Sequence, residues 1–191
     1  MPIDEEIASR KKELIANCFM RNFKKNGMRN TIVSDVASEL HISKKTIYKY
    51  FKGGKEDALY YFFHKIAEVY KDEVENKLDN RDNYREKVAV LIREIIKQGK
   101  PYVQQNVADT DDYMVENQIV GQAFRDVYED LLKNLIIGGI DSGEFEATNT
   151  RLMITFIYGM LLESMKIIHE NPAVDIERDL IAAVLKLLST A

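Results

Sequence analysis

Only one cysteine, Cys18, occurs in the 191 residues, so the chain has no internal disulfide. A lone thiol fits the reducing cytosol. We expect no apolar stretch that is long enough to span a bilayer, and the acidic residues after Met1 have the wrong charge for a signal peptide. These absences predict a cytoplasmic protein without a membrane segment. Cys18 itself falls on the apolar face of a predicted helix, where a buried core position is expected.

The residues that commonly carry catalysis are sparse. The three histidines, His41, His64 and His169, are scattered, and none follows a glutamate at the Glu-x-x-His spacing of di-metal helical bundles. The sequence has neither a P-loop nor a glycine-rich dinucleotide fingerprint. We therefore expect no catalytic residue, no metal site and no cofactor. A helical enzyme with an incidental basic segment stays open as the weakest hypothesis.

Charge is unevenly distributed along the chain. The net charge of the whole sequence is −4. Residues 9–55 hold 12 lysines and arginines against 3 acids, a net charge of +9, which leaves −13 for the rest. A basic segment joined to an acidic body is typical of a nucleic-acid-binding protein with a separate second module.

Apolar periodicity predicts an all-α chain. Helices are expected at about 4–26, 31–40, 44–50, 56–78, 84–98, 112–137, 149–169 and 175–188. Gly27 is expected to end the first helix as a residue of positive φ. Gly99 and Pro101 are expected to stop the fifth helix, residues 101–112 to be irregular, and Gly138-Gly139 to end the sixth.

The most informative segment is residues 31–51, which predicts two short helices joined by a tight turn, a helix-turn-helix unit. Ser43 is a suitable N-cap for the second helix. Ile47 and Phe51 are expected to face inward, which leaves a mostly basic and hydroxyl-bearing surface. That surface consists of Lys44, Lys45, Thr46, Tyr48, Lys49 and Tyr50.

These side chains suit duplex DNA. Lysines neutralise phosphates and release counterions, and threonine and tyrosine hydroxyls bind phosphate oxygens. Threonine also contacts base edges or a thymine methyl group. A short amphipathic helix with a solvated lysine face explains the same pattern, so the segment alone leaves both interpretations open.

With its flanks, the segment resembles the tetracycline-repressor (TetR) family of bacterial transcription regulators. Residues 27–37 follow G-x-x-x-T-x-V-x-D-V-A, residues 42–51 follow I-S-K-x-T-I-Y-x-Y-F, and Lys55-Glu56 completes the pattern. The resemblance covers about the first third of the chain. It implies a three-helix DNA-binding head at residues 1–55, with its motif at about 32–51, followed by a helical effector-binding and dimerisation domain at 56–191.

The resemblance also implies roles for single residues. Tyr48, Tyr50 and Lys55 lie where the family contacts phosphates, and Thr31 lies near the DNA backbone at the start of the supporting helix. Lys44, Lys45, Thr46 and Lys49 lie on the groove-facing part of the recognition helix.

The sequence departs from the family pattern at three places. His41 stands where the family has glycine in the turn, and histidine is among the residues that tolerate a left-handed backbone. Ile32 replaces a polar helix cap, so Thr31 is expected to cap the helix one residue early. Lys52-Gly53-Gly54 is one residue longer than usual, which is expected to shift Lys55.

The two closing helices, about 149–169 and 175–188, are rich in apolar residues. A monomer of this size has difficulty covering both, so a second copy is expected to cover them in a four-helix dimer interface. The resemblance implies the same arrangement. In a second interpretation, the two helices only close the core of a single chain. Paired heads one DNA turn apart would read a palindrome.

The predicted function is a homodimeric transcriptional regulator, best described as a repressor, which binds a palindromic double-stranded operator and is released by an unknown small-molecule effector. Control by a protein partner instead of a small ligand is the alternative. Candidate effector-lining residues are aromatic, sulfur-bearing or acidic residues of the body. Core packing is the preferred interpretation of each aromatic residue and methionine, and a partly exposed or paired side chain is the preferred interpretation of the glutamate. The candidates are Tyr84, Tyr102, Met114, Phe124, Tyr128, Phe156, Met160 and Glu163.

Overall fold

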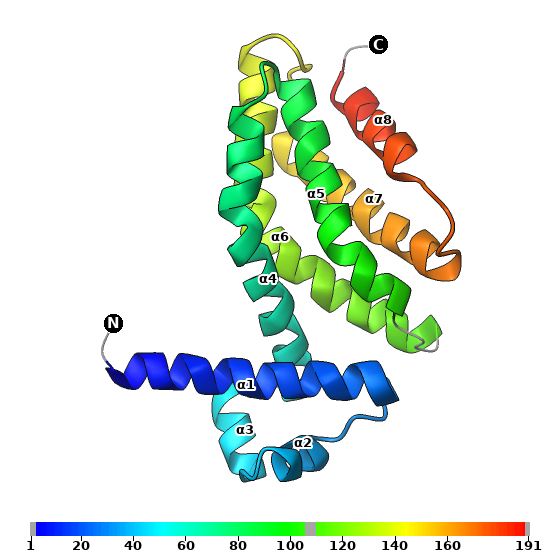
Figure 1. Ribbon diagram of the computed structural model, residues 1–191. Helices are drawn as coiled ribbons and strands as arrows, with labels where there is room; N and C mark the ends of the chain where they lie inside the picture. Colours follow the sequence, from blue (N-terminus) through cyan, green and yellow to red (C-terminus); the bar gives the residue numbers. More distant parts are fainter. Residues whose placement is uncertain (1–2, 106–109, 190–191) are drawn as a thin grey trace. The chain divides into compact units, whose positions relative to one another are not determined.

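A computed structural model describes residues 3–105 and 110–189, without the side chains of residues 3–4, 104–105 and 110–112. Within these ranges the chain forms eight α-helices and no strand (Figure 1), which confirms the all-α prediction. The helices are α1 (Ile3–Asn26), α2 (Val33–Glu39), α3 (Lys44–Tyr50), α4 (Lys55–Asp79), α5 (Tyr84–Gln105), α6 (Thr110–Asp141), α7 (Thr150–Glu170) and α8 (Glu177–Leu188).

The helices form two compact units. Residues 1–65 and 105–123 make the first, and residues 66–104 and 124–191 make the second. Helices α4 and α6 are therefore each divided between the units. This division differs from the boundary expected at residue 55, which stays a prediction.

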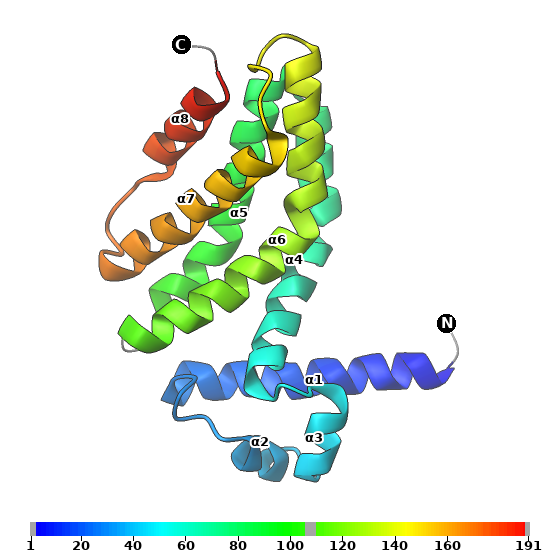
Figure 2. The ribbon, with the colours of Figure 1, turned by 180° about the vertical axis from the view of Figure 1, so that it is seen from behind.

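In the first unit, α1, α2 and α3 form a three-helix head, visible in blue and cyan in Figure 2. Gly27 ends α1 with φ of +77°, and His41 takes the turn between α2 and α3 with φ of +53°, as expected. The Ser43 hydroxyl accepts the Thr46 N–H at 3.1 Å and caps α3. Ile47 and Phe51 are almost fully buried, so the inward face of the helix-turn-helix unit is confirmed.

The start of α2 differs from the expectation for Thr31. The N-cap is Ile32, which makes no side-chain cap hydrogen bond. Thr31 is buried, and its hydroxyl donates to the Gly27 carbonyl at 2.8 Å. Because that hydroxyl is occupied in the preceding turn, Thr31 fixes the connection between α1 and α2 instead of capping α2.

The predicted end of α5 was wrong. The helix continues through Gly99 and Pro101 to Gln105, whereas residues 106–109 of the expected irregular segment lie outside the described residues. Gly99 is a position of close approach, because a Cβ there would lie 3.2 Å from Met165 Cε. Val103 is buried and its carbonyl lies 3.2 Å from His169 Nδ1, so tertiary packing outweighs the roughly 3 kcal/mol cost of an internal proline.

The predicted end of α6 was also wrong, because the helix runs through Gly138 and Gly139 to Asp141. Both glycines allow aromatic rings to lie directly against the helix. A Cβ at Gly138 would overlap the Tyr84 ring, and one at Gly139 would overlap the Phe145 ring. The turn that ends α6 instead contains Gly143, with φ of +77°.

Helices α7 and α8 lie side by side in the second unit (Figure 1). The expectation that no apolar stretch could span a bilayer was wrong for α7, which is long and apolar enough by length and composition. A core helix of a soluble protein passes the same test, and 44% of its most apolar window is buried inside the chain. Glu163 and Lys166 also form an ion pair at 3.5 Å on this helix.

Candidate nucleic-acid interface

Helix α3 presents a basic and hydroxyl-bearing surface. Lys44, Lys45 and Lys49 are exposed, and 46% of Tyr48 is accessible to solvent. Across the part of the chain that the structure describes, no acid pairs with Lys44 or Lys45. Their ammonium groups are therefore available to an anionic partner.

The two remaining predicted residues of α3 are less accessible. Thr46 is half-buried, and its hydroxyl lies 2.9 Å from the Ser43 hydroxyl. Tyr50 is also half-buried, and the Lys49 ammonium lies 6.0 Å from the centre of its ring. Both side chains thus support the shape of α3 while keeping part of their surface in solvent.

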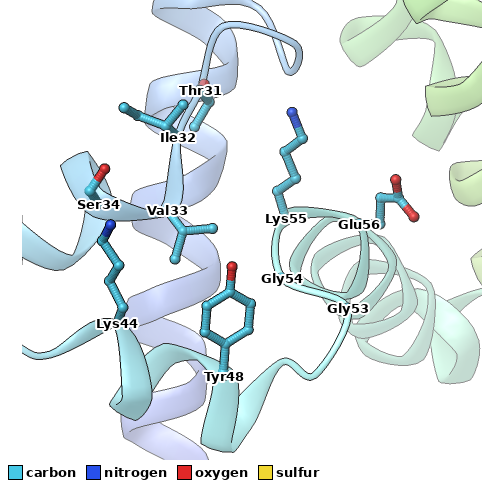
Figure 3. Close-up of a pocket in the computed structure, with 10 residues that line it drawn as sticks. All are labelled: Thr31, Ile32, Val33, Ser34, Lys44, Tyr48, Gly53, Gly54, Lys55 and Glu56. Atoms are coloured by element: carbon cyan, nitrogen blue, oxygen red, sulfur yellow. The ribbon is translucent and has the colours of Figure 1, made fainter.

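An open groove of about 490 Å³ lies in the head between the start of α2, helix α3 and the start of α4. Figure 3 shows Lys44 and Tyr48 extending from α3 toward the side of Val33 and Ser34. The lining residues are Thr31, Ile32, Val33, Ser34, Lys44, Tyr48, Gly53, Gly54, Lys55 and Glu56. Cationic and hydroxyl groups on the walls of an open groove suit a phosphate oxygen of a nucleic-acid backbone.

Ser34 is a groove residue that sequence reasoning missed. Its position in the first turn of α2, one turn from the groove-lining Thr31, was the available signal. The basic pattern of α3 pointed to the second helix alone, although both helices form the groove.

The Lys55 side chain has partners inside the head. Its ammonium donates to the Met28 carbonyl at 2.9 Å and to the Arg29 carbonyl at 3.3 Å. The extra residue before it is accommodated by Gly54, with φ of +66°, and the Gly53 N–H donates to Asp57 Oδ2 at 2.7 Å. Lys55 and the buried Thr31 are thus brought to the groove, but their phosphate contacts stay predictions.

A polar cluster holds α2 against α1. Arg21 Nη2 donates to Glu39 Oε1 at 2.7 Å, and Asn22 Nδ2 donates to Glu39 Oε2 at 2.9 Å. These bonds, with that of Arg21 first, lower the pKa of Glu39 from 4.5 to about 2. The neighbouring Cys18 is buried in the core as expected, and burial raises the pKa of its thiol to about 11.

Replacing Arg21 by glutamine should raise the pKa of Glu39 from about 2 toward 4.5. Because the pKa of Glu39 is lower in the folded chain than in the unfolded chain, its carboxylate stabilises the head fully at pH values above about 4.5. That contribution is lost as the pH falls from about 4.5 through about 2. An NMR titration of the Glu39 carboxyl carbon measures the shift. Arg10→Gln, at the separate Arg10–Glu6 pair, should leave Glu39 unchanged, and a wild-type Glu39 that titrates near 4.5 would contradict the prediction.

The eight candidate effector-lining residues lie in different surroundings. Phe124 and Tyr128 are buried, and the Tyr128 hydroxyl donates to the Ala67 carbonyl at 3.1 Å. The Tyr84 ring lies against Gly138, and Tyr102 and Met160 are half-buried. Met114 and Phe156 are exposed, and the Glu163 side chain is 66% accessible.

Several of these residues therefore have structural roles. Tyr128 also exchanges a hydrogen bond with the Gln98 side chain, which ties α6 to α5. Tyr84 and Phe124 pack inside the second unit, whereas Phe156 and Glu163 lie on the exposed side of α7. An effector contact of any of the eight stays a prediction. Among the described residues, no group of three or more His, Cys, Asp or Glu is arranged to hold a metal ion.

The head of this chain is similar to that of known proteins. Residues 20–60 match the family model described as bacterial regulatory proteins, tetR family. No curated protein matches the chain. The matched segment contains the whole helix-turn-helix unit and the residues that line the groove.

Solved structures match nearly the whole chain. RolR in complex with resorcinol is 14% identical, with 96% of this chain and 90% of that chain covered and a TM-score of 0.73. FadR from Bacillus subtilis, in complex with stearoyl-CoA, is 23% identical, with 93% and 97% covered and a TM-score of 0.61. KstR2 of Mycobacterium tuberculosis is 17% identical, with 95% and 96% covered and a TM-score of 0.59.

Residues 20–60 are thus similar to the tetR family of bacterial regulatory proteins, and the fold of the chain is similar to those of RolR and KstR2. Proteins of this family are transcriptional regulators, and many are ligand-responsive repressors.

Proposed function

We propose that the protein is a cytoplasmic transcriptional repressor that binds a palindromic DNA operator as a homodimer. The observation that carries this proposal is the surface of α3, where Lys44 and Lys45 lack acidic partners within the described chain and Lys44 lines an open groove. Lysines in such positions release counterions when they neutralise phosphates, which favours binding.

The proposed contacts divide by chemistry. Lys44, Lys45 and Lys49 bind phosphates or base edges, and Tyr48 donates its hydroxyl to a phosphate oxygen. Thr46 and Tyr50 contact the DNA through the part of each side chain that remains exposed to solvent. The short helix α3 lies in the major groove with its N-terminal residues toward the bases, as in other helix-turn-helix proteins.

Dimerisation through α7 and α8 is supported by their exposed apolar residues. Leu152, Phe156 and Ile167 are exposed at spacings that place them on one face of α7, and Leu187 is exposed on α8. Exposed large apolar side chains that share one face of a helix favour a protein interface there. A second copy that covers this face also provides the second head that a palindrome requires.

Phe156→Asp should convert the protein from a dimer to a monomer of 22.1 kDa, because it places a charge in the proposed interface. Light scattering at several protein concentrations measures the mass. Val69→Asp is the matched control, since Val69 is 75% exposed on α4 and lies outside the proposed interface. A wild-type protein that is monomeric at all concentrations would disprove this part of the proposal.

A small molecule that binds the second unit is proposed to release the DNA. The neighbouring structures supply the support, because RolR and FadR were solved with resorcinol and stearoyl-CoA respectively. For such control, the effector must bind the DNA-released state more tightly than the DNA-bound state. A protein partner that binds the second unit would meet the same requirement and is the alternative.

Selection of duplexes from a random-sequence library, followed by footprinting, tests the proposal directly. The expected result is an enriched palindrome with two protected half-sites whose centres lie about one helical turn apart, or a multiple of it. Binding should weaken steeply as salt rises. Enrichment of no sequence, together with salt-independent binding, would reject DNA recognition.

A further inference from the structure

We propose that Lys55 is a positioning residue that holds the loop of residues 27–32, and that Arg29, carried by this loop, contacts a DNA phosphate at the edge of the groove. The inference rests on the proposed DNA-binding function and assigns the contact on this side of the head to a different residue. The resemblance at the sequence level assigned that contact to Lys55.

The Lys55 ammonium is committed to the backbone of the loop. It donates to two consecutive carbonyls, at 2.9 Å for Met28 and 3.3 Å for Arg29. An ammonium group has three N–H donors, so two of them are occupied inside the protein. The side chain is also half-buried, which limits its reach toward an external phosphate.

The loop has several further attachments of its own. Met28 is buried, and its carbonyl also accepts the Thr31 N–H at 3.3 Å. The Thr31 hydroxyl donates to the Gly27 carbonyl at 2.8 Å. For the Arg29 carbonyl, Lys55 is the donor in the described structure. The lysine therefore fixes the part of the loop that the other bonds leave unattached.

The start of α4 directs the Lys55 side chain toward the loop, as Figure 3 shows. Gly54 takes a positive φ of +66°, which a residue with a Cβ rarely adopts, and Asp57 accepts the Gly53 N–H. The extra glycine that departs from the family pattern is part of this turn.

Arg29 is the cation that this arrangement presents to solvent. Its side chain is exposed, and no acid pairs with it in the described part of the chain. Thr31 and Ile32, two and three residues further along the loop, line the groove. A guanidinium at this edge suits a phosphate, because its planar donors match two phosphate oxygens at once.

Lys55→Met and Arg29→Gln, singly and together, test the proposal on a duplex selected by the wild-type protein. Arg29→Gln should lower affinity about tenfold and reduce the slope of log affinity against log salt by about 0.9 for each phosphate that is no longer neutralised. Lys55→Met should weaken binding to a similar degree, and the double variant should bind no more weakly than the weaker single variant. Lys55→Arg should bind like the wild type, because a guanidinium can also donate to both carbonyls.

Independent effects of the two substitutions would overturn the inference. If Lys55→Met reduces the salt slope equally in the wild-type and Arg29→Gln backgrounds, Lys55 contacts a phosphate itself. Arg29→Gln is at an exposed position, so it should leave the melting temperature unchanged, and an unaltered salt slope for this variant alone also overturns the inference. A wild-type protein that selects no duplex rejects the proposed function, which is a distinct outcome.

Discussion

Replacing Lys44, Lys45 and Lys49 together by glutamine should weaken binding to the selected duplex by about a thousandfold or more at 0.1 M salt. Glutamine keeps much of the side-chain length but removes the charge. A dimer loses six cations, so the slope of log affinity against log salt should fall by about 5 if each contacts a phosphate. A titration of binding at several salt concentrations measures both quantities.

A matched triple variant separates local contacts from total charge. Arg81, Lys97 and Lys133 are exposed in the second unit outside α7 and α8, and their replacement by glutamine removes the same number of positive charges from each chain. This variant should keep nearly full affinity and the wild-type salt slope. Equal weakening of binding in the two triple variants would mean that long-range charge, and not the α3 surface, governs binding. All three α3 lysines are exposed, so the melting temperature should remain close to that of the wild type.

Replacing Gly139 by alanine should destabilise the second unit by about 2–3 kcal/mol, because the Phe145 ring must leave its buried site. A Cβ at position 139 would overlap this ring, and Phe145 is only 4% exposed. The Gly139 carbonyl also accepts the Glu144 and Phe145 N–H groups, both at 2.9 Å, which keeps the ring close to the helix. For a chain of this size the melting temperature should fall by about 4–12 °C. Thermal and urea unfolding followed by circular dichroism measure the change.

A double-mutant cycle identifies the cause. Phe145→Ala removes the ring, so adding Gly139→Ala in that background should be neutral or stabilising by up to about 1 kcal/mol, since alanine favours the helix. The double variant should therefore be clearly more stable than the sum of the two single effects on the free energy of unfolding predicts. Equal destabilisation by Gly139→Ala in both backgrounds would show that the backbone at residue 139, and not the ring, requires glycine.

Local interactions explain why the head could be predicted from the sequence. The turn residues Gly27 and His41 take positive φ, and Ser43 caps a helix that begins at the next residue. Each of these features depends on groups within a few residues along the chain. The burial of Ile47 and Phe51 follows from helical spacing, which is also a local property.

The ends of the helices in the second unit could not be predicted from local sequence signals. Gly99, Pro101 and the Gly138-Gly139 pair are ordinary helix-breaking signals, yet α5 and α6 continue through them. Met165, Tyr84 and Phe145 pack against the glycines, and the gain from this packing exceeds the small intrinsic cost of glycine in a helix. The partners of Gly99 and Gly138 are distant in the sequence, so no short window could reveal them.

The candidate site shows the same division. The sequence by itself determined that α3 begins after Ser43 and carries Lys44, Lys45, Tyr48 and Lys49 on its outer faces, because helical spacing and capping are local. Only the tertiary structure decided that Thr31 is buried and that the Lys55 ammonium donates to Met28 and Arg29. Those bonds join residues more than twenty positions apart, and a long flexible side chain takes whichever acceptors the folded chain brings within reach.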